Sequence, residues 1–496
     1  MPDWLHAPDQ WFARLVLQRG LGAVYLVAFL VALTQFRPLL GEQGLLPVRR
    51  YLAGRRFRDA PSLFHLHYSD RLLVAVAGTG MAVSLAVVLG LPDAWPVPLT
   101  VATWLVLWAL YLSIVNVGQR FYGFGWESLL LEAGFLAAFL GPAWSAVPVP
   151  VLWLFRWLLF RVEFGAGLIK LRGDPCWRKL TCLDYHHETQ PMPGPLSWYF
   201  HRLPRPLHRA EVLGSHFAQL VAPILLFFPQ PVATFAGLVM ALTQAWLVLS
   251  GNYSWLNVVT ILLAASALDD AALSRLLPLE RAATTPSLSL DVLVLALTVL
   301  VLALSYRPAR NLVSSEQVMN TSFDPLRLVN TYGAFGSVTK VRHEVAIEGT
   351  SDETLGPDTV WREYAFRGKP TDPKRRPRHF APYHLRLDWL MWFAALSPAY
   401  AQGWLEPLLH KLLRNDPATL RLLRSNPFPD RPPHAIRATL YRYRFTTWRE
   451  RRETGAWWVR TPVREYLPPL TRDGPHRLAP DLARGYRGAP LHQDER

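Results

Sequence analysis

The sequence predicts a multi-pass α-helical membrane bundle of about nine helices, followed by a mostly β soluble domain. The chain has 496 residues, of which 51% are hydrophobic. Before about residue 305 the apolar residues form long blocks with few charges, as membrane-spanning helices require. After that point apolar and polar residues alternate with a period of two, which is typical of strands. We therefore place the membrane domain at 1–305 and the soluble domain at 306–470.

Nine apolar segments in the first part are candidates for membrane helices. A helix needs roughly 20 apolar residues to cross the hydrocarbon core, and fewer where protein shields it. Two long polar loops, 37–70 and 171–211, interrupt the series. The predicted helices cover 19–36, 71–90, 98–117, 126–140, 149–170, 212–228, 232–250, 254–268 and 288–305.

The second part combines predicted strands with two helices. Segments 387–396 and 405–413 have helical patterns, and 369–378 is a basic surface loop broken by prolines. Residues 471–496, rich in Arg, Pro and Gly, are expected to be a poorly ordered tail. The predicted strands are 328–335, 338–347, 360–366 and 435–445.

The net charge of +15 suggests anionic lipid or an arginine-rich proteome rather than nucleic acid, because the basic residues are scattered and no nucleic-acid motif is present. The first 20 residues do not form a cleavable signal peptide, so the first apolar helix serves as the insertion signal. Nine helices place both long loops and the C-terminal domain on one side of the membrane. The positive-inside rule assigns that side to the cytoplasm, although the rule is weakest for long loops.

Charged residues inside membrane helices are the first candidate site. They cost about 2.5–3.5 kcal/mol at the helix centre and therefore face the interior of the bundle. Arg156, Glu163 and Lys170 are seven residues apart, on nearly one face of the segment 149–170, and Glu127 and Glu132 belong to the preceding helix. These residues either form buried ion pairs that fix helix register or line a polar cavity. If they line a cavity, Lys170 lies at its mouth and acts as a base. As a third alternative, the Lys170 side chain extends to the membrane interface.

The loop after Lys170 is the second candidate site. Cys176 and Cys182 enclose five residues, which is not the redox spacing. They form a structural disulfide if the loop is exoplasmic and free thiols if it is cytoplasmic. Metal-ligand residue types follow, but adjacent histidines in a loop lack the geometry of a helical zinc pair. We therefore expect a hydrogen-bonded loop with no metal and no cofactor; its polar residues are Asp184, His186, His187 and Glu188.

Long motifs in both parts resemble the lipase maturation factor family. They are 116–127, 164–193, 250–257, 381–393 and 441–445, with Trp457 and Trp458. The resemblance implies a multi-pass membrane protein with a soluble C-terminal domain. In animals, members of the family lie in the endoplasmic reticulum membrane and help secreted dimeric lipases to reach their active fold. The arginine-rich composition and the lack of a retention signal suggest a bacterial inner-membrane member.

A more distant resemblance concerns Lys170. The stretch 166–171, with Asp174 and Trp177, is similar to the surroundings of the catalytic lysine of vitamin-K-dependent γ-carboxylase. The resemblance implies that Lys170 occupies the position of the carboxylase base. The spacing to Trp177 differs, and the Asn-His pair of the carboxylase has no histidine here, where Asn116 and Gln119 lie instead. Vitamin K chemistry is therefore not expected. In both related families the long loops and the C-terminal domain are exoplasmic, which we adopt over the charge rule.

Three hypotheses follow. The first is a membrane-embedded maturation or folding factor that binds a lipase or another exported client with its exoplasmic loops and C-terminal domain, with membrane lipids as its other partners. It is favoured because the sequence has no complete catalytic motif. The second is a membrane enzyme acting on a lipid, quinone or peptide, with Lys170 as base beside Glu163, Arg156 and Asn116. The third is a structural scaffold.

Overall fold

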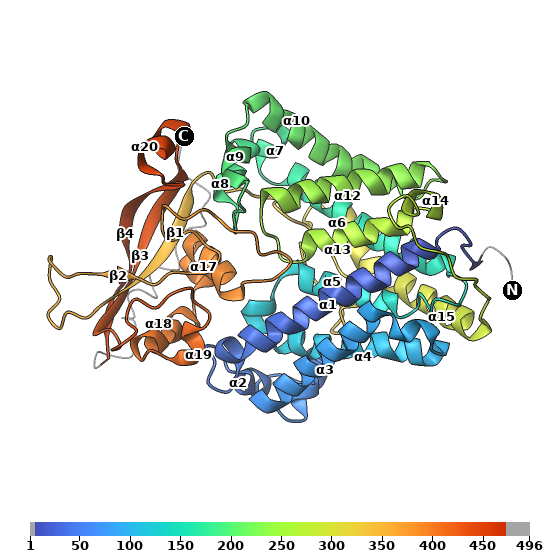
Figure 1. Ribbon diagram of the computed structural model, residues 1–496, viewed down its shortest axis with the longest axis horizontal. Coiled ribbons are helices and arrows are strands. Elements are labelled where there is room, and N and C mark those ends of the chain that lie inside the picture. Colours follow the sequence, from blue (N-terminus) through green and yellow to red (C-terminus); the bar gives the residue numbers. More distant parts are fainter. Residues whose placement is uncertain (1–4, 473–496) are drawn as a thin grey trace. The chain divides into compact units, whose positions relative to one another are not determined.

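The computed structural model describes residues 5–472, which divide into two compact units (Figure 1). A helical unit contains 5–37, 47–340 and 378–384. A second unit contains 38–46, 341–377 and 385–472 and holds the β-sheet. The prediction of a membrane bundle followed by a mostly β domain is confirmed.

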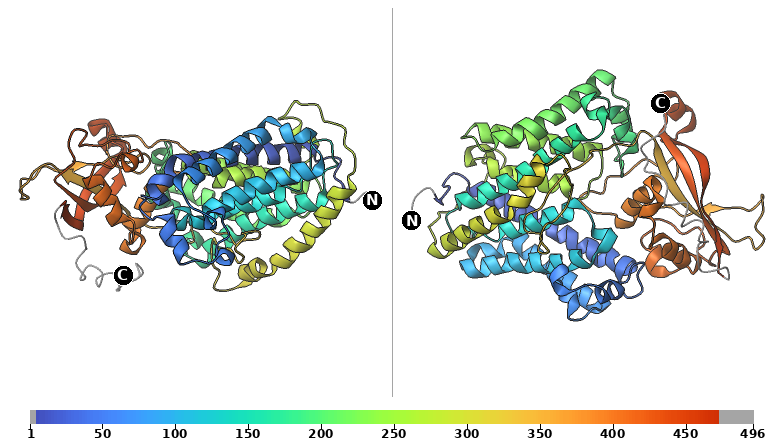
Figure 2. Two further views of the ribbon diagram at one scale, coloured as in Figure 1. Left: turned by 90° about the horizontal axis from the view of Figure 1, so that it is seen from below. Right: turned by 180° about the vertical axis from the view of Figure 1, so that it is seen from behind.

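All nine predicted membrane segments are helical over most of their length. Within 5–472, five helices are long and apolar enough to cross a membrane. These five are α1 (Trp11–Leu40), α3 (Asp70–Leu89), α4 (Val97–Val117), α12 (Val232–Ser250) and α15 (Leu288–Leu304), which α16 (Tyr306–Val313) continues. Figures 1 and 2 show them within one bundle, in which α15 crosses the direction of α1.

The remaining segments form shorter or more polar helices. α5 (Gly125–Ala137) is buried from Trp126 to its end, and this stretch includes the two acidic residues Glu127 and Glu132. α6 (Val149–Arg172) carries the charged residues. α10 (Arg205–His216) leads through a π-helical turn at Phe217–Val221 into α11 (Ala222–Leu225), and α13 (Leu256–Ala264) ends in a 3₁₀ turn.

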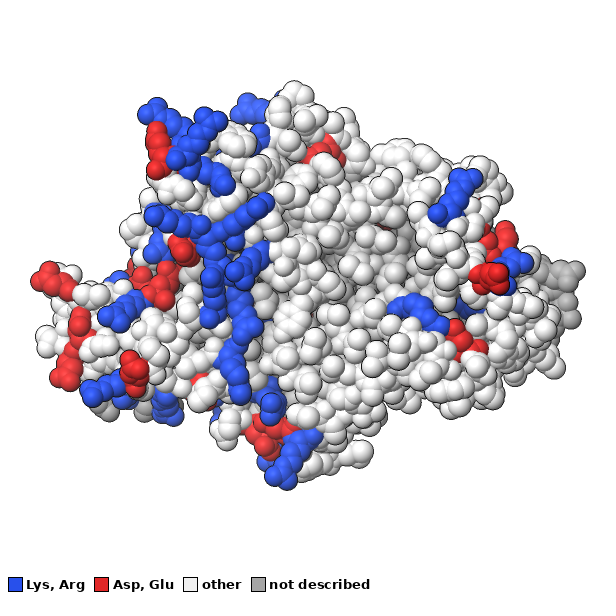
Figure 3. Space-filling model, in the orientation of Figure 1, with Lys and Arg blue, Asp and Glu red and all other residues white. Residues whose placement is uncertain are grey.

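Large apolar side chains on the outside of the helical unit fit a lipid environment. Figure 3 shows a broad face of this unit without charged side chains. Soluble proteins rarely expose apolar patches of this kind. Exposed examples on the long helices are Leu85, Leu89, Leu99, Val106, Leu242, Val299 and Leu302.

The two long loops contain helices of their own. The first contains α2 (Val48–Ala53) and two 3₁₀ turns, Phe57–Asp59 and Leu63–His65. The second contains α7 (Pro175–Arg178), α8 (Leu183–Thr189), α9 (Ser197–His201) and part of α10. α7 begins where the Asp174 carboxylate accepts a hydrogen bond from the Cys176 amide, at 2.9 Å. The segment 171–211 is therefore a folded cap, not an irregular loop.

The second unit is built on a four-stranded antiparallel sheet in the order β2-β1-β3-β4. α17 (Arg386–Leu396) contacts β1, and α18 (Leu405–Leu413) contacts β3. α19 (Pro417–Leu420) follows, and α20 (Trp448–Thr454) connects β3 to β4. The strands are β1 (Arg342–Thr350), β2 (Arg362–Glu363), β3 (Ala435–Phe445) and β4 (Trp458–Thr471).

Several details of the predicted second part were wrong. Segment 328–335 is not a strand and belongs to the helical unit, where 328–333 are all buried and 330–332 bond to α5 and α6. β4 was missed because prolines argue against strands, yet β4 is an edge strand, which tolerates them. Lys369 is buried beside Glu344 at 3.2 Å, not exposed in a surface loop. The predicted tail, 471–496, lies outside the described residues except for its first two.

Candidate functional site

Lys170 lies in the last turn of α6, buried against the cap. Its Nζ donates hydrogen bonds to Gln219 Oε1 at 2.8 Å and to Ser215 Oγ at 3.3 Å. The ammonium group also lies 4.6 Å from the centre of the Trp177 ring, within range of a cation–π interaction. Trp177 is fixed in turn, because its Nε1 donates to the Phe335 carbonyl at 2.8 Å. Lys170 therefore has three partners and is buried.

Glu163, two turns earlier on α6, is connected to Lys170 through Gln219. Its carboxylate accepts hydrogen bonds from Gln219 Nε2 at 3.2 Å and from Gln244 Nε2 at 2.7 Å. Gln244 Oε1 then accepts from Asn257 Nδ2 at 2.6 Å. All of these residues are buried. The result is a polar chain of five side chains, which we call the Lys170 network: Lys170, Gln219, Glu163, Gln244 and Asn257.

The π-helical turn at Phe217–Val221 positions the central member of this network. Gln219 lies within the turn, and Gly167 of α6 packs directly against it. A Cβ on Gly167 would lie 3.0 Å from the Gln219 carbonyl oxygen and closer still to the Leu220 side chain. Glycine therefore permits this approach, and π turns occur frequently at functional sites.

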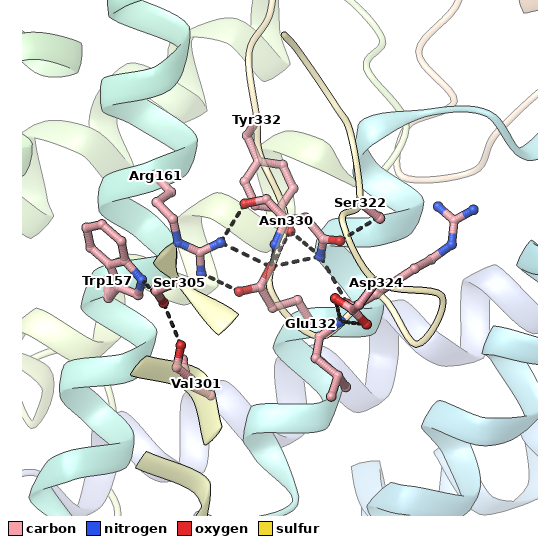
Figure 4. Close-up of polar contacts among 11 residues, drawn as sticks. Glu132, Trp157, Arg161, Val301, Ser305, Ser322, Asp324, Asn330 and Tyr332 are labelled. Atoms are coloured by element: carbon pink, nitrogen blue, oxygen red, sulfur yellow. Dashed lines mark hydrogen bonds and ion pairs between the residues drawn. The ribbon is translucent and has the colours of Figure 1, made fainter. Parts of the chain in front are cut away.

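A second network surrounds Glu132 of α5 and Arg161 of α6, which form a buried ion pair (Figure 4). The other Glu132 oxygen accepts from the Tyr332 hydroxyl at 2.7 Å, and from the backbone and side-chain nitrogens of Asn330 at 3.0 and 2.9 Å. Arg161 also donates to the Asn330 carbonyl at 2.7 Å. This Glu132 network fastens the segment 330–332 to two helices of the bundle.

The structure separates the other predicted polar residues from Lys170. Arg156 donates to the carbonyls of Ser266 at 2.9 Å and Leu226 at 3.3 Å. Asn116 donates to the carbonyls of Pro61 and Pro325 and accepts from Arg327. Arg156 thus satisfies carbonyls at the ends of helical turns, and Asn116 fastens a loop.

Glu127 contacts residues outside the Lys170 network, and Gln119 lies in a turn of the backbone. Glu127 accepts from the Tyr111 hydroxyl, and its other oxygen lies 3.7 Å from His384 Nδ1. Gln119 adopts a positive φ of 48° in the turn after α4. The predicted grouping of Asn116 and Arg156 with Lys170 is therefore not seen as direct contact.

The cap contains the predicted loop residues. Cys176 and Cys182 form a disulfide, with Cα atoms 4.9 Å apart, in a small apolar cluster with Trp177 and Val212. Asp184 lies 3.4 Å from His208, and Glu188 lies 3.5 Å from His201.

Histidines of the cap are buried beside polar partners. His186 Nε2 lies 3.3 Å from the Tyr253 hydroxyl. Burial lowers the pKa of His186 to about 3 and that of His201 to about 3, so both imidazoles are neutral at pH 7.

Sequence reasoning missed Gln219, Gln244 and Asn257, which complete the Lys170 network, and Asn330 and Tyr332, which complete the Glu132 network. Arg161 was recognised as a charged residue on another face of its helix, but its pairing with Glu132 was not predicted. A signal for the first three was available, because amide side chains inside apolar helices are costly and usually face polar partners. The Lys170 network can balance a buried ammonium group against a carboxylate and connect them by exchangeable hydrogen bonds.

Known families match both parts of the chain. Residues 12–275 match the lipase maturation factor transmembrane domain, and residues 328–468 match the lipase maturation factor C-terminal domain. The first match contains the Lys170 network together with Glu132 and Arg161, and the second contains Asn330 and Tyr332. No solved structure matches the chain.

Full-length relatives agree with this assignment. Lipase maturation factor 1 of Bos taurus is 44% identical, with 95% of this chain and 91% of the relative covered. The Homo sapiens protein of the same name is 43% identical, with coverage of 95% and 90%. Lipase maturation factor 2 of Gallus gallus is 30% identical, with coverage of 93% and 82%. The chain is therefore a multi-pass membrane protein that belongs to the lipase maturation factor family.

Proposed function

We propose that this chain is a membrane-embedded maturation factor for a secreted lipase or a similar exported client. The observation that carries the proposal is the extent of the similarity, which covers the membrane part and the C-terminal part together. Relatives named for lipase maturation match over nearly their whole length.

The cap and the second unit are the proposed client-binding surfaces. The second unit exposes large apolar side chains, and aromatic residues are enriched where proteins bind one another. These side chains are Leu355, Val360, Tyr400, Trp448 and Val463. The disulfide of the cap supports an exoplasmic position, because disulfides persist in oxidising compartments.

The function is tested by coexpression with a secreted dimeric lipase in cells that lack their own family member. We expect lipase activity per amount of secreted lipase to rise when the chain is present. Pull-down of the chain should recover the lipase. Unchanged specific activity together with no recovered lipase would contradict the proposal.

A second function, catalysis on a lipid, quinone or peptide with Lys170 as base, is favoured by one observation. Lys170 and Glu163 are buried and joined through a single amide side chain. Lys170→Met removes the base, whereas Lys170→Arg keeps the charge. If Lys170→Met is produced normally and retains full activity in the lipase assay, the enzymatic function fails.

We propose a membrane location with lipids around the helices and, as the family resemblance implies, with the two long loops and the second unit on the exoplasmic side. The relatives named above are from vertebrate animals. The expectation of a bacterial inner membrane, drawn from composition, has no support among them.

A further inference from the structure

Three metal-ligand side chains from two helices of the cap meet beside the bundle. His187 lies on α8, and His208 and Glu211 lie on α10. One ligand atom from each residue lies within 4.8 Å of the other two. His208 and Glu211 are three residues apart, so they share one face of α10. The sequence pattern does not reveal this group, because His187 is adjacent to His186 in the sequence whereas its neighbours in space belong to a later helix.

His187 is buried and Glu211 is partly buried, and polar atoms of both side chains have no hydrogen-bond partner among residues 5–472. The His187 side chain is 4% exposed, and neither of its ring nitrogens has a hydrogen-bond partner among residues 5–472. Glu211 Oε2, also without a partner in that part of the chain, lies 3.9 Å from His187 Nε2. A buried polar atom without a partner costs about 1–3 kcal/mol. His187 Nε2 and Glu211 Oε2 face each other without a hydrogen bond, and an ion between them would satisfy both.

The third residue is already oriented by its surroundings. His208 Nε2 lies 3.0 Å from the Phe200 carbonyl, which only accepts hydrogen bonds, so this nitrogen carries the proton. In the neutral ring Nδ1 is then left with a lone pair, 3.4 Å from a carboxylate oxygen of Asp184. A metal ion at Nδ1, or a second ring proton donated to Asp184, would satisfy both atoms. A carbonyl partner on the second nitrogen is the usual support of a metal-binding histidine.

Glu211 is oriented as well, because its Oε1 accepts a hydrogen bond from Trp246 Nε1 at 2.7 Å. This leaves Oε2 directed to the histidines. We propose that His187, His208 and Glu211 bind a divalent transition-metal ion, with Zn²⁺ the best fit. Two imidazoles and one carboxylate are a known ligand set for zinc, and the ion would tie α8 to α10. An ion pair between His187 and Glu211 without metal is the competing explanation.

The test uses the full-length chain in detergent, purified with a tag that binds no metal. After treatment with a chelator and re-equilibration with Zn²⁺, bound metal is measured by mass spectrometry. We expect about one ion per chain, and Co²⁺ in its place should give the visible absorption of a tetrahedral site. Absence of stoichiometric Zn²⁺ and Co²⁺ binding would overturn the proposal and leave the ion pair.

Variants locate the site. His187→Gln and Glu211→Gln should each lower metal affinity by at least about tenfold. The matched control is His201→Gln, which removes another histidine of the cap, one that lies 3.5 Å from Glu188 and outside the group of three. It should bind metal as the unmodified chain does. Unchanged affinity in a monodisperse His187→Gln protein would contradict the assignment. If the variants do not fold, the stoichiometry and the Co²⁺ spectrum of the unmodified chain decide the question.

Discussion

The ion pair between Glu132 and Arg161 places two charges where water does not reach, with each side chain only 1% exposed. Removing both charges from water is costly, and their attraction offsets this only when the other polar atoms are also satisfied. Asn330 and Tyr332 provide that satisfaction for Glu132. The pair therefore specifies how α5, α6 and the segment 330–332 meet.

Arg161→Met is expected to destabilise the protein strongly, because it leaves the Glu132 carboxylate buried without its cation. The cost of such a break is about 3–5 kcal/mol. Thermal unfolding of the detergent-solubilised protein would measure it as a large fall in the midpoint, and Glu132→Leu in addition should restore part of the loss.

Arg58→Met is the control for this experiment. Arg58 lies 3.7 Å from Asp59, but the two side chains are 74% and 49% exposed, so this pair contributes about 0–1 kcal/mol. Equal midpoints for Arg161→Met and Arg58→Met would refute the structural role of the buried pair.

At the scale of elements, helix positions could be predicted and helix partners could not. Apolar blocks mark most of the bundle because lipid and core both require them. α1 begins earlier than predicted because its polar first turns are buried against distant carbonyls. Arg14 donates to Ser145 at 2.6 Å and Gln18 to Gly141 at 2.9 Å. These acceptors are backbone atoms more than 100 residues away, which no local pattern reveals.

Because partners distant in the sequence leave no local pattern, sequence reasoning found only part of the candidate sites. Glu163 and Lys170 were predicted because a helical period places them on one face. Arg156 lies seven residues before Glu163 and thus on nearly the same face, yet it donates hydrogen bonds to the Ser266 and Leu226 carbonyls. A period fixes the face of a helix but not which neighbour covers that face at each turn.

Gly167→Ala tests the close contact between α6 and the π turn. The added Cβ would press on the Gln219 carbonyl and the Leu220 side chain, so the two elements must separate. We expect a loss of about 1–3 kcal/mol in stability, because well-packed sites do not accept an extra methyl group. The same substitution at Gly214 of α10, which has open space around it, is the control.

Alanine favours a helix interior by up to about 1 kcal/mol over glycine, so Gly214→Ala should raise the unfolding midpoint slightly or leave it unchanged. If Gly167→Ala lowers the unfolding midpoint and Gly214→Ala does not, the loss at Gly167 comes from the close contact between α6 and the π turn. A neutral or stabilising Gly167→Ala would show that the π turn adapts without cost.

At the scale of the whole molecule, the two units alternate along the chain. Residues 38–46, which begin within the last turn of α1, belong to the second unit, and 378–384 return to the helical unit. Asn252 holds the segment 378–384 in the helical unit, because its Oδ1 accepts hydrogen bonds from the amides of Phe380 and Ala381 at 2.8 and 3.0 Å. The division at residue 305 suggested by hydropathy marks where the membrane helices end, whereas the units divide where contacts become sparse.

Asn252→Ala should therefore release the returning segment without disturbing the sheet. The substitution removes the acceptor of two backbone hydrogen bonds, and each hydrogen bond contributes about 0.5–1.5 kcal/mol net to stability. Limited proteolysis after the arginines and lysines of 374–378 should become faster, while the β1–β3 core stays protected in hydrogen exchange. The control is Asn426→Ala, whose amide bonds only within the second unit. Faster cleavage in that control alone would argue against the proposed role of Asn252.

Orientation is the property on which the proposed function depends most, because a client in transit is met only from the exoplasmic side. The charge rule and the family resemblance disagree about it, and the Cys176–Cys182 disulfide favours the resemblance.

Single introduced cysteines can decide the orientation, since both native cysteines are paired with each other. Arg56 in the first long loop and Ala94 between α3 and α4 are both exposed and lie at opposite ends of α3. A maleimide that cannot cross membranes, added to sealed spheroplasts of an expression host, should label Arg56→Cys at once and Ala94→Cys only after permeabilisation. The reverse pattern would place the cap and the second unit in the cytoplasm, where a disulfide is unstable and a secreted client is out of reach.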